Sequence, residues 1–101
     1  MTLATRSILD ELAVDTEAHR YGLDLGTATG LPSGTVHPIL ARLEGLGWVE
    51  SGWEEVDPRA VGRPRRRYYR LTPEGARAAE RALATRPWPG PARPRTAKGL
   101  T

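Results

Sequence analysis

The 101-residue sequence contains no cysteine, which excludes disulfide bonds and thiolate metal sites. It also lacks any apolar run approaching about 20 residues, the length that a membrane-spanning helix requires. The first residues have no long apolar stretch of the kind that secretory signals contain. We therefore expect a soluble, cytoplasmic protein. Its length supports one domain, and so small a domain favours a partner chain that shares the core.

Groups suited to catalysis are few. Three serines and two histidines offer no nucleophile and base at the spacing of a known motif. The paired carboxylates Asp10/Glu11 and Glu54/Glu55 are adjacent, so their side chains diverge on a helix or a strand. Two histidines without cysteine do not predict a metal site. The sequence therefore predicts a protein that is not an enzyme and has no cofactor.

Charge is distributed unevenly along the chain. Residues 1–50 contain three arginines and seven acids, whereas residues 51–101 contain twelve Lys and Arg and five acids. The first half therefore carries −4 and the second half +7, which adds up to the net charge of +3. Such asymmetry favours a surface in the second half that faces a polyanion, although a solvated basic face would give the same pattern.

Three helices are predicted in the first half. They cover residues 3–14, residues 20–29 with Gly30 as the stop, and a segment that Ser33 caps and Gly47 ends. Pro38 lies in or just past the first turn of the third helix, where its missing N–H costs least. The apolar residues that recur at helical spacing are Leu3, Ile8, Leu9, Leu12 and Ala13; then Tyr21, Leu25 and Ala28; then Val36, Ile39, Leu40, Leu43 and Leu46.

A hairpin and a fourth helix follow. Alternation predicts strands over residues 48–55 and 65–71, joined by a loop that contains Gly62-Arg63-Pro64. Thr72 and Pro73 then start a helix that reaches about Arg86. The order of elements predicts an α+β, mainly α, winged helix-turn-helix over residues 1–86. The proline- and arginine-rich residues 87–101 are predicted to be a disordered tail.

Several motifs go beyond the pattern of elements. They are Tyr21-Gly22-Leu23-Asp24-Leu25, Leu31 to Glu44 (LPSGTVHPILARLE), Gly47-Trp48-Val49-Glu50-Ser51 and Gly62 to Gly75 (GRPRRRYYRLTPEG). In this order they resemble the second helix, recognition helix, first wing strand, and wing with last-helix start of PadR-type transcriptional regulators of the small class. The chain departs from the family at His37, where tyrosine is common, and in a last helix with few large apolar side chains.

The resemblance implies a homodimeric repressor that binds double-stranded DNA at a palindromic operator. It also implies a dimer interface made by the first and last helices, and it leaves room for a small-molecule effector. Some regulators of this kind bind flat aromatic effectors, which tryptophans would stack against, although Trp48 and Trp53 suit ordinary strand packing.

The predicted DNA interface has two parts. The start of a recognition helix lies near base edges in the major groove, and basic wing residues contact phosphates or a narrow minor groove. The candidate residues are Ser33, Gly34, Thr35, His37, Pro38 and Arg42 on the helix, and Arg63, Arg65, Arg66 and Tyr68 on the wing. Arg67 and Tyr69 share the strand face that points to the core, so their role is taken to be more structural.

An alternative is a winged-helix protein-interaction module that has lost specific DNA binding, for which the acidic first half and the proline-rich tail leave room. Wing arginines aligned with the recognition helix argue against it. RNA binding by the basic wing is less favoured, because no aromatic pair forms the platform of an RNA-binding module.

Overall fold

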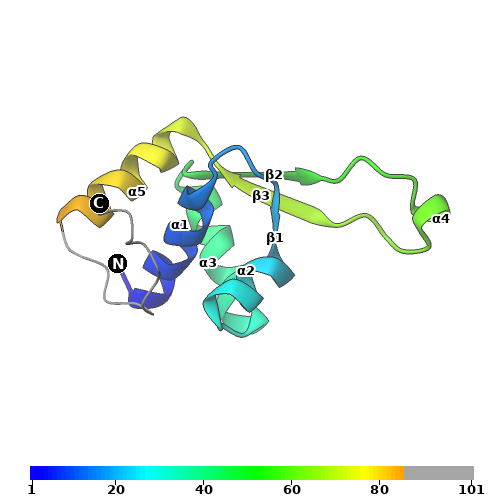
Figure 1. Ribbon diagram of the computed structural model, residues 1–101, viewed down its shortest axis with the longest axis horizontal. Helices are drawn as coiled ribbons and strands as arrows, with labels where there is room; N and C mark the ends of the chain where they lie inside the picture. The colour runs from blue at the N-terminus through cyan, green and yellow to red at the C-terminus, as the bar shows by residue number, and fades with distance from the viewer. Residues whose placement is uncertain (86–101) are drawn as a thin grey trace, which may run out of the picture.

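Five helices and three strands lie along residues 1–85, the part of the chain that the computed structural model describes (Figure 1). The elements in order are α1 (Leu3–Val14), β1 (Arg20–Tyr21), α2 (Gly22–Thr29), α3 (Ser33–Gly45), β2 (Val49–Trp53), α4 (Pro58–Val61), β3 (Arg67–Leu71) and α5 (Pro73–Thr85). The predicted tail at 87–101 lies outside the described residues. None of the helices in residues 1–85 has the length and apolar character needed to cross a bilayer.

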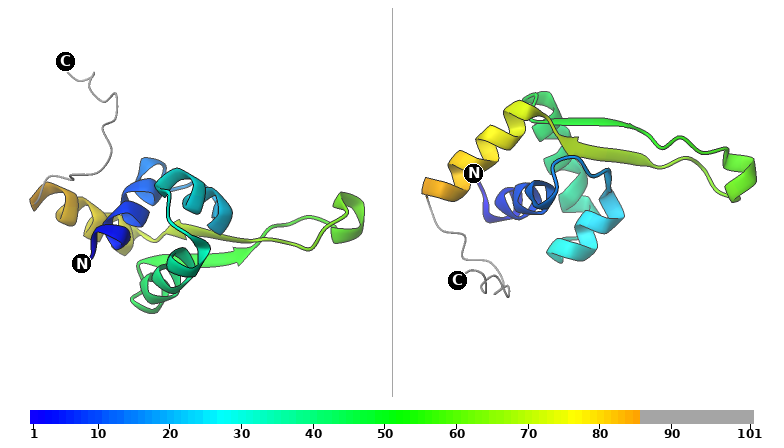
Figure 2. Two further views of the ribbon diagram at one scale, coloured as in Figure 1. Left: turned by 90° about the horizontal axis from the view of Figure 1, so that it is seen from below. Right: turned by 45° about the horizontal axis from the view of Figure 1, so that its top comes forward.

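The three strands form one antiparallel sheet in the order β1-β3-β2. Tyr69 in the middle strand pairs with Arg20 on one side and with Ser51 on the other. Beyond this sheet, the chain between β2 and β3 continues as a long arm that carries α4 and extends away from the helices (Figures 1 and 2). The fold is therefore a winged helix-turn-helix, as the order of elements predicts.

The core lies where α1, α2 and α3 meet the base of the sheet and α5. Each of these elements gives at least one buried apolar side chain, as the predicted helical stripes require. The buried cluster consists of Ile8, Leu9, Leu12, Leu25, Val36, Ile39, Leu40, Leu43, Val49, Leu71 and Ala79. Apolar burial is the main source of stability for such a domain, so this cluster fixes how α3 and the wing are presented.

Three details of the helices differ from the predictions. Ser33 is the first residue of α3 and not its cap; Pro32 takes the capping position, and no side-chain oxygen bonds the first turn. Leu46 was predicted to face the core but is exposed, because α3 ends at Gly45 and the chain turns away. Residues 20–21 belong to strand β1 and not to the second helix, since Arg20 and Tyr21 pair with β3.

Other helix ends follow the sequence signals. Gly30 ends α2 in the left-handed conformation, with φ of 76°, which favours glycine. The hydroxyl of Thr72 accepts a hydrogen bond of 3.0 Å from the N–H of Gly75 and so caps α5, with Pro73 as its first residue. The cap places α5 beside α1 at the end of the molecule that lies away from the arm (Figure 1).

Candidate nucleic-acid interface

Helix α3 has one buried and one exposed face. Val36, Ile39, Leu40 and Leu43 are buried, and they hold the helix against α1 and α2. The exposed face contains most of the helix residues predicted to contact DNA. These are Ser33, Gly34, His37, Pro38 and Arg42, while Thr35 is half-buried. A rigid helix with a polar and basic free face is what reading of the major groove requires.

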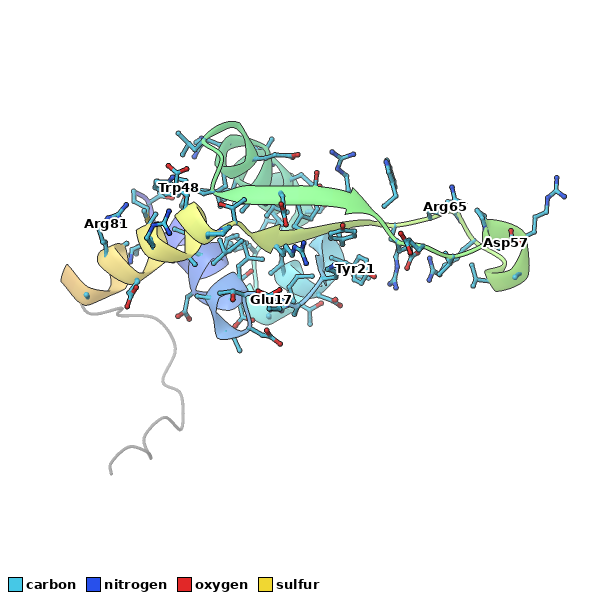
Figure 3. All side chains as sticks on the ribbon, turned by 90° about the horizontal axis from the view of Figure 1, so that it is seen from above. Glu17, Tyr21, Trp48, Asp57, Arg65 and Arg81 are labelled. Atoms are coloured by element: carbon cyan, nitrogen blue, oxygen red, sulfur yellow. The ribbon has the colours of Figure 1, made fainter. Side chains whose placement is uncertain are left out.

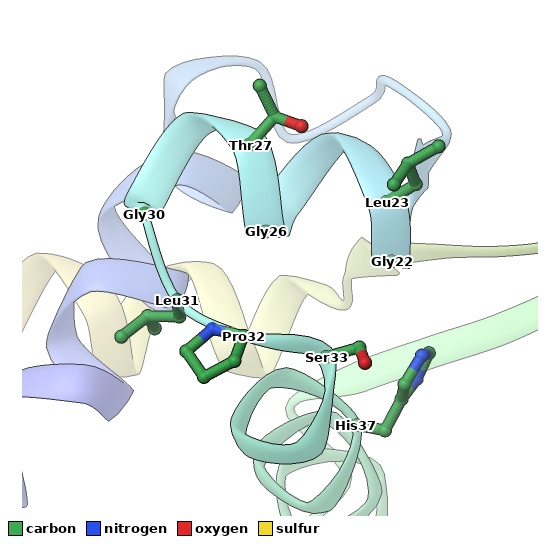
Figure 4. A pocket seen from close by; sticks show the side chains of 9 residues that line it. All are labelled: Gly22, Leu23, Gly26, Thr27, Gly30, Leu31, Pro32, Ser33 and His37. Atoms are coloured by element: carbon green, nitrogen blue, oxygen red, sulfur yellow. The ribbon is translucent and has the colours of Figure 1, made fainter.

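A groove of about 540 Å³ separates α2 from the start of α3 (Figure 4). His37 reaches from α3 toward Gly22 at the beginning of α2, and both residues line the groove. A Cβ atom added to Gly22 would lie only 2.8 Å from Cε1 of His37. The imidazole therefore rests against the backbone of α2 where a larger residue would push it away.

Helix α3 also contacts the base of the wing, which is the hairpin made of β2, the arm and β3. Glu44, near its C-terminal end, accepts a hydrogen bond of 2.7 Å from the hydroxyl of Ser51 on β2. Nη2 of Arg67 on β3 donates to the same hydroxyl at 2.8 Å and lies 3.7 Å from the Glu44 carboxylate. The Arg67 guanidinium also lies 5.3 Å from the centre of the Trp53 ring. These contacts agree with the structural role predicted for Arg67 and hold the wing at a set angle to α3.

Two of the wing arginines, Arg63 and Arg66, contact one carboxylate, Glu54, which directly follows β2. Arg63 forms an ion pair with Glu54, and Nη2 of Arg66 lies 3.4 Å from the same carboxylate. The backbone N–H of Arg66 donates a further hydrogen bond of 2.9 Å to Glu54. The alternation that predicted a strand over residues 48–55 did not indicate that Glu54 would be buried.

The surroundings of Glu54 change its titration. Its hydrogen bond from Arg63, aided by the bonds from Arg66 and opposed by burial, lowers its pKa from the ordinary 4.5 to about 2. The carboxylate thus stays charged in the folded protein well below the pH at which it is protonated in an unfolded chain. Its contribution to stability is fully present above about pH 4.5 and is lost as the pH falls through about 2.

Tyr68 was predicted to face outward, where its hydroxyl would reach a phosphate. The structure places it half-buried, with its ring stacked on His19 at a centroid distance of 3.7 Å. A Cβ atom on Gly52 would lie 2.6 Å from the Tyr68 hydroxyl oxygen, so the ring also covers that glycine. Tyr68 is therefore a packed residue of the sheet, and its contact with DNA stays a prediction.

The model of the PadR-like family of transcriptional regulators matches residues 12–81, which is more than half of the chain and includes both α3 and the wing. The chain belongs to this family. The resemblance drawn from the sequence motifs is thereby confirmed, as is the winged-helix fold that it implies.

Solved structures are similar to this PadR-like chain over most of its length. A PadR family transcriptional regulator from Eggerthella lenta is 29% identical, with a TM-score of 0.61 over 77% of this chain and 69% of its own. The smu.1704 protein of Streptococcus mutans is 26% identical, with a TM-score of 0.64, and the match covers 83% of this chain and 77% of that one.

Apo MarR from E. coli has a TM-score of 0.68 at 24% identity, and the match covers 83% of this chain. The PadR-like chain spans only 56% of MarR, and the similarity concerns the fold alone. None of the curated proteins matches the chain.

One basic residue of the PadR-like wing was missed by the sequence analysis. Arg59 lies on α4, a short helix that Asp57 caps by accepting a hydrogen bond of 3.0 Å from the Arg59 N–H. Its side chain is exposed and bonds no other described residue of the chain. Figure 3 shows Asp57 and Arg65 far out on the arm, at the opposite end from Trp48. The Asp57-Pro58 pair, a cap followed by proline at the first helical position, was the signal that could have revealed α4.

Proposed function

We propose that the chain is a DNA-binding transcriptional regulator that acts as a homodimeric repressor on a palindromic operator. The observation that carries this proposal is the pairing, in one PadR-like domain, of an exposed helix face on α3 with an arginine-rich arm. Helices of this kind enter the major groove, while basic wings contact the backbone or the minor groove.

The proposed interface consists of two groups of side chains that have different roles. On α3 the short residues Ser33, Gly34 and Thr35 let the helix approach the phosphates, and Thr35, His37, Pro38 and Arg42 are the candidates to contact base edges. On the wing, Arg63, Arg65, Arg66 and Tyr68 contact the backbone. In a dimer, two copies of α3 would enter successive major grooves about 34 Å apart.

Binding to the promoter region of the gene that encodes the chain tests the proposal. Fluorescence anisotropy at moderate salt should show tighter binding to that duplex than to a random duplex of equal length. Equal binding to both would argue against a specific operator in that region. Binding at background level, together with a co-purified protein partner, would favour the interaction module instead.

The different roles of α3 and the wing lead to a sharper prediction. Arg65→Ala should weaken binding to all duplexes and lower the slope of log K against log[salt] by about 1, as the loss of one phosphate contact should. His37→Ala should instead change the preference among operator variants, with a discrimination loss of about 1–3 kcal/mol at one base pair. If the two variants behave alike, the assignment of reading to α3 and of backbone contact to the wing is wrong.

A further inference from the structure

Glu54 occupies a special place at the base of the arm. Its backbone N–H donates a hydrogen bond of 2.9 Å to the carbonyl of Arg66. Beyond this backbone hydrogen bond the two sides of the arm separate. Only 8% of its side chain is exposed, although its neighbours Trp53 and Glu55 are both exposed. A buried acid in this position is unexpected in a surface that faces a polyanion, because it subtracts from the positive field of the wing.

Both oxygens of the Glu54 carboxylate accept from the same two arginines. Oε1 accepts from Nη1 of Arg63 and from the Arg66 N–H, and Oε2 accepts from Nη2 of each arginine at 3.4 Å. The Arg66 guanidinium also lies 4.2 Å from the centre of the Tyr21 ring. Yet 39% of the Arg63 side chain and 49% of the Arg66 side chain remain exposed. Each guanidinium is thus held on one side and open on the other.

We propose that Glu54 is a positioning residue for DNA binding, which holds Arg63 and Arg66 with their open edges toward the phosphate backbone. The proposal rests on the proposed function of the wing. Free arginines lose much rotamer freedom when they bind a phosphate, and a carboxylate that fixes them beforehand removes part of that cost. The gain from ordered arginines then exceeds the loss from one added negative charge.

Two isosteric variants separate these effects. Glu54→Gln and Glu55→Gln each remove one negative charge from neighbouring positions, but Glu55 is exposed and bonds no other described residue. Charge alone predicts that both variants bind DNA slightly more tightly. Positioning predicts that Glu55→Gln does so, whereas Glu54→Gln binds roughly five- to tenfold more weakly. The probe is a fluorescent random duplex of about 30 base pairs at low salt, where phosphate contacts dominate.

A second pair of measurements tests whether Glu54 acts through the arginines. In a background that carries Arg63→Ala and Arg66→Ala, Glu54→Gln should behave like Glu55→Gln, because no arginine is left to position. Continued weakening in that background would overturn the proposal and assign Glu54 to the fold of the arm. Thermal unfolding of every variant checks that it is folded.

A third pair of variants tests the proposal if Glu54→Gln does not fold. Arg63→Lys keeps the charge but loses the two-pronged contact with Glu54, so it should weaken binding several-fold more than the control Arg65→Lys. The proposal is overturned if Arg63→Lys and Arg65→Lys weaken DNA binding equally. It is also overturned if Glu54→Gln and Glu55→Gln bind DNA with equal affinity. In both cases the unmodified chain would still bind DNA, so the proposed function would stand. Absence of DNA binding by the unmodified chain would overturn the proposed function as well.

Discussion

The direction of the His37 side chain depends on a residue of another helix. Because its imidazole rests against Gly22, the backbone of α2 determines which way the side chain leaves α3. This dependence could not be read from the sequence, since the two residues are fifteen positions apart and meet only when α2 and α3 pack. The identity of His37 as an exposed residue of the reading helix was, by contrast, visible from the apolar stripe on the opposite face.

Gly22→Ala should alter sequence preference without removing the histidine. The added Cβ would lie 2.8 Å from Cε1 of His37, and the exposed ring will give way more readily than the backbone. We expect binding to a panel of operator variants to shift in the same sense as with His37→Ala, with little change in thermal stability. Gly45→Ala, which has open space around it on the same helix as His37, is the control. An unchanged preference in Gly22→Ala would show that the ring direction does not matter.

The environment of Glu54 was likewise beyond local sequence reasoning. Alternation placed the residue in a predicted strand, but its burial depends on the way the chain after it folds back to bring Arg63 and Arg66 over it. The charge run 63–70 was recognised from the sequence as the basic part of a wing. The sequence did not reveal that two arginines of this run, Arg63 and Arg66, both contact the carboxylate of Glu54.

At the scale of elements, α5 is seated directly on the backbone that leads into β2. The N–H of Thr72 donates a hydrogen bond of 3.0 Å to the carbonyl of Trp48. One turn later, a Cβ atom on Gly75 would lie 1.9 Å from that same carbonyl oxygen. The contact allows no side chain, so glycine at this position determines how closely the last helix approaches the sheet.

Gly75→Ala should therefore destabilise the fold although alanine favours helices. Relief of the clash requires α5 or the Trp48 backbone to move, and such overpacking costs roughly 2 kcal/mol or more. Chemical denaturation should show a lower midpoint. Gly45→Ala meets no neighbour and should be neutral or slightly stabilising. A Gly75→Ala variant as stable as the unmodified chain would mean that α5 does not sit as closely as described.

The elements that the sequence predicted well are those with local signals. The helical stripes placed α1 and α3 within a residue or two, Gly30 placed the end of α2, and the Thr72-Pro73 pair placed the start of α5. Strand β1 was missed because two residues carry no alternation, and its existence depends on pairing with a distant strand. Helix α4 was missed because four residues are too few for a periodic pattern.

For the whole molecule, the proposed homodimer is the main prediction. Helices α1 and α5 pack together at the end opposite the arm (Figure 1). Two apolar side chains of α1, Leu3 and Val14, are exposed. Sedimentation should give about twice the 11.1 kDa of one chain. Leu3→Glu should raise the dimer dissociation constant at least tenfold, because it places a charge at an apolar interface.

Leu23→Glu provides the matched control for the dimer. Leu23 is a leucine of similar exposure, but it lies on α2 beside the groove and away from the proposed interface. The variant should leave the mass of the dimer unchanged. A monomer in the unmodified chain, or equal loss of dimer in both variants, would contradict an interface built from the first and last helices.

The two tryptophans that bracket β2 give the chain its own optical reporters. Trp48 is half-buried and packs against the core, whereas Trp53 is 56% exposed beside Arg67 on the wing. Indole emission depends on the polarity around the ring, so the two residues respond to different events. The emission of Trp53 reports on contacts made at the wing, and the emission of Trp48 reports on loss of the core packing. The chain has a third tryptophan, Trp88. With Trp88 and either Trp48 or Trp53 replaced by tyrosine, the intrinsic fluorescence of the remaining tryptophan can follow binding or unfolding without an attached dye.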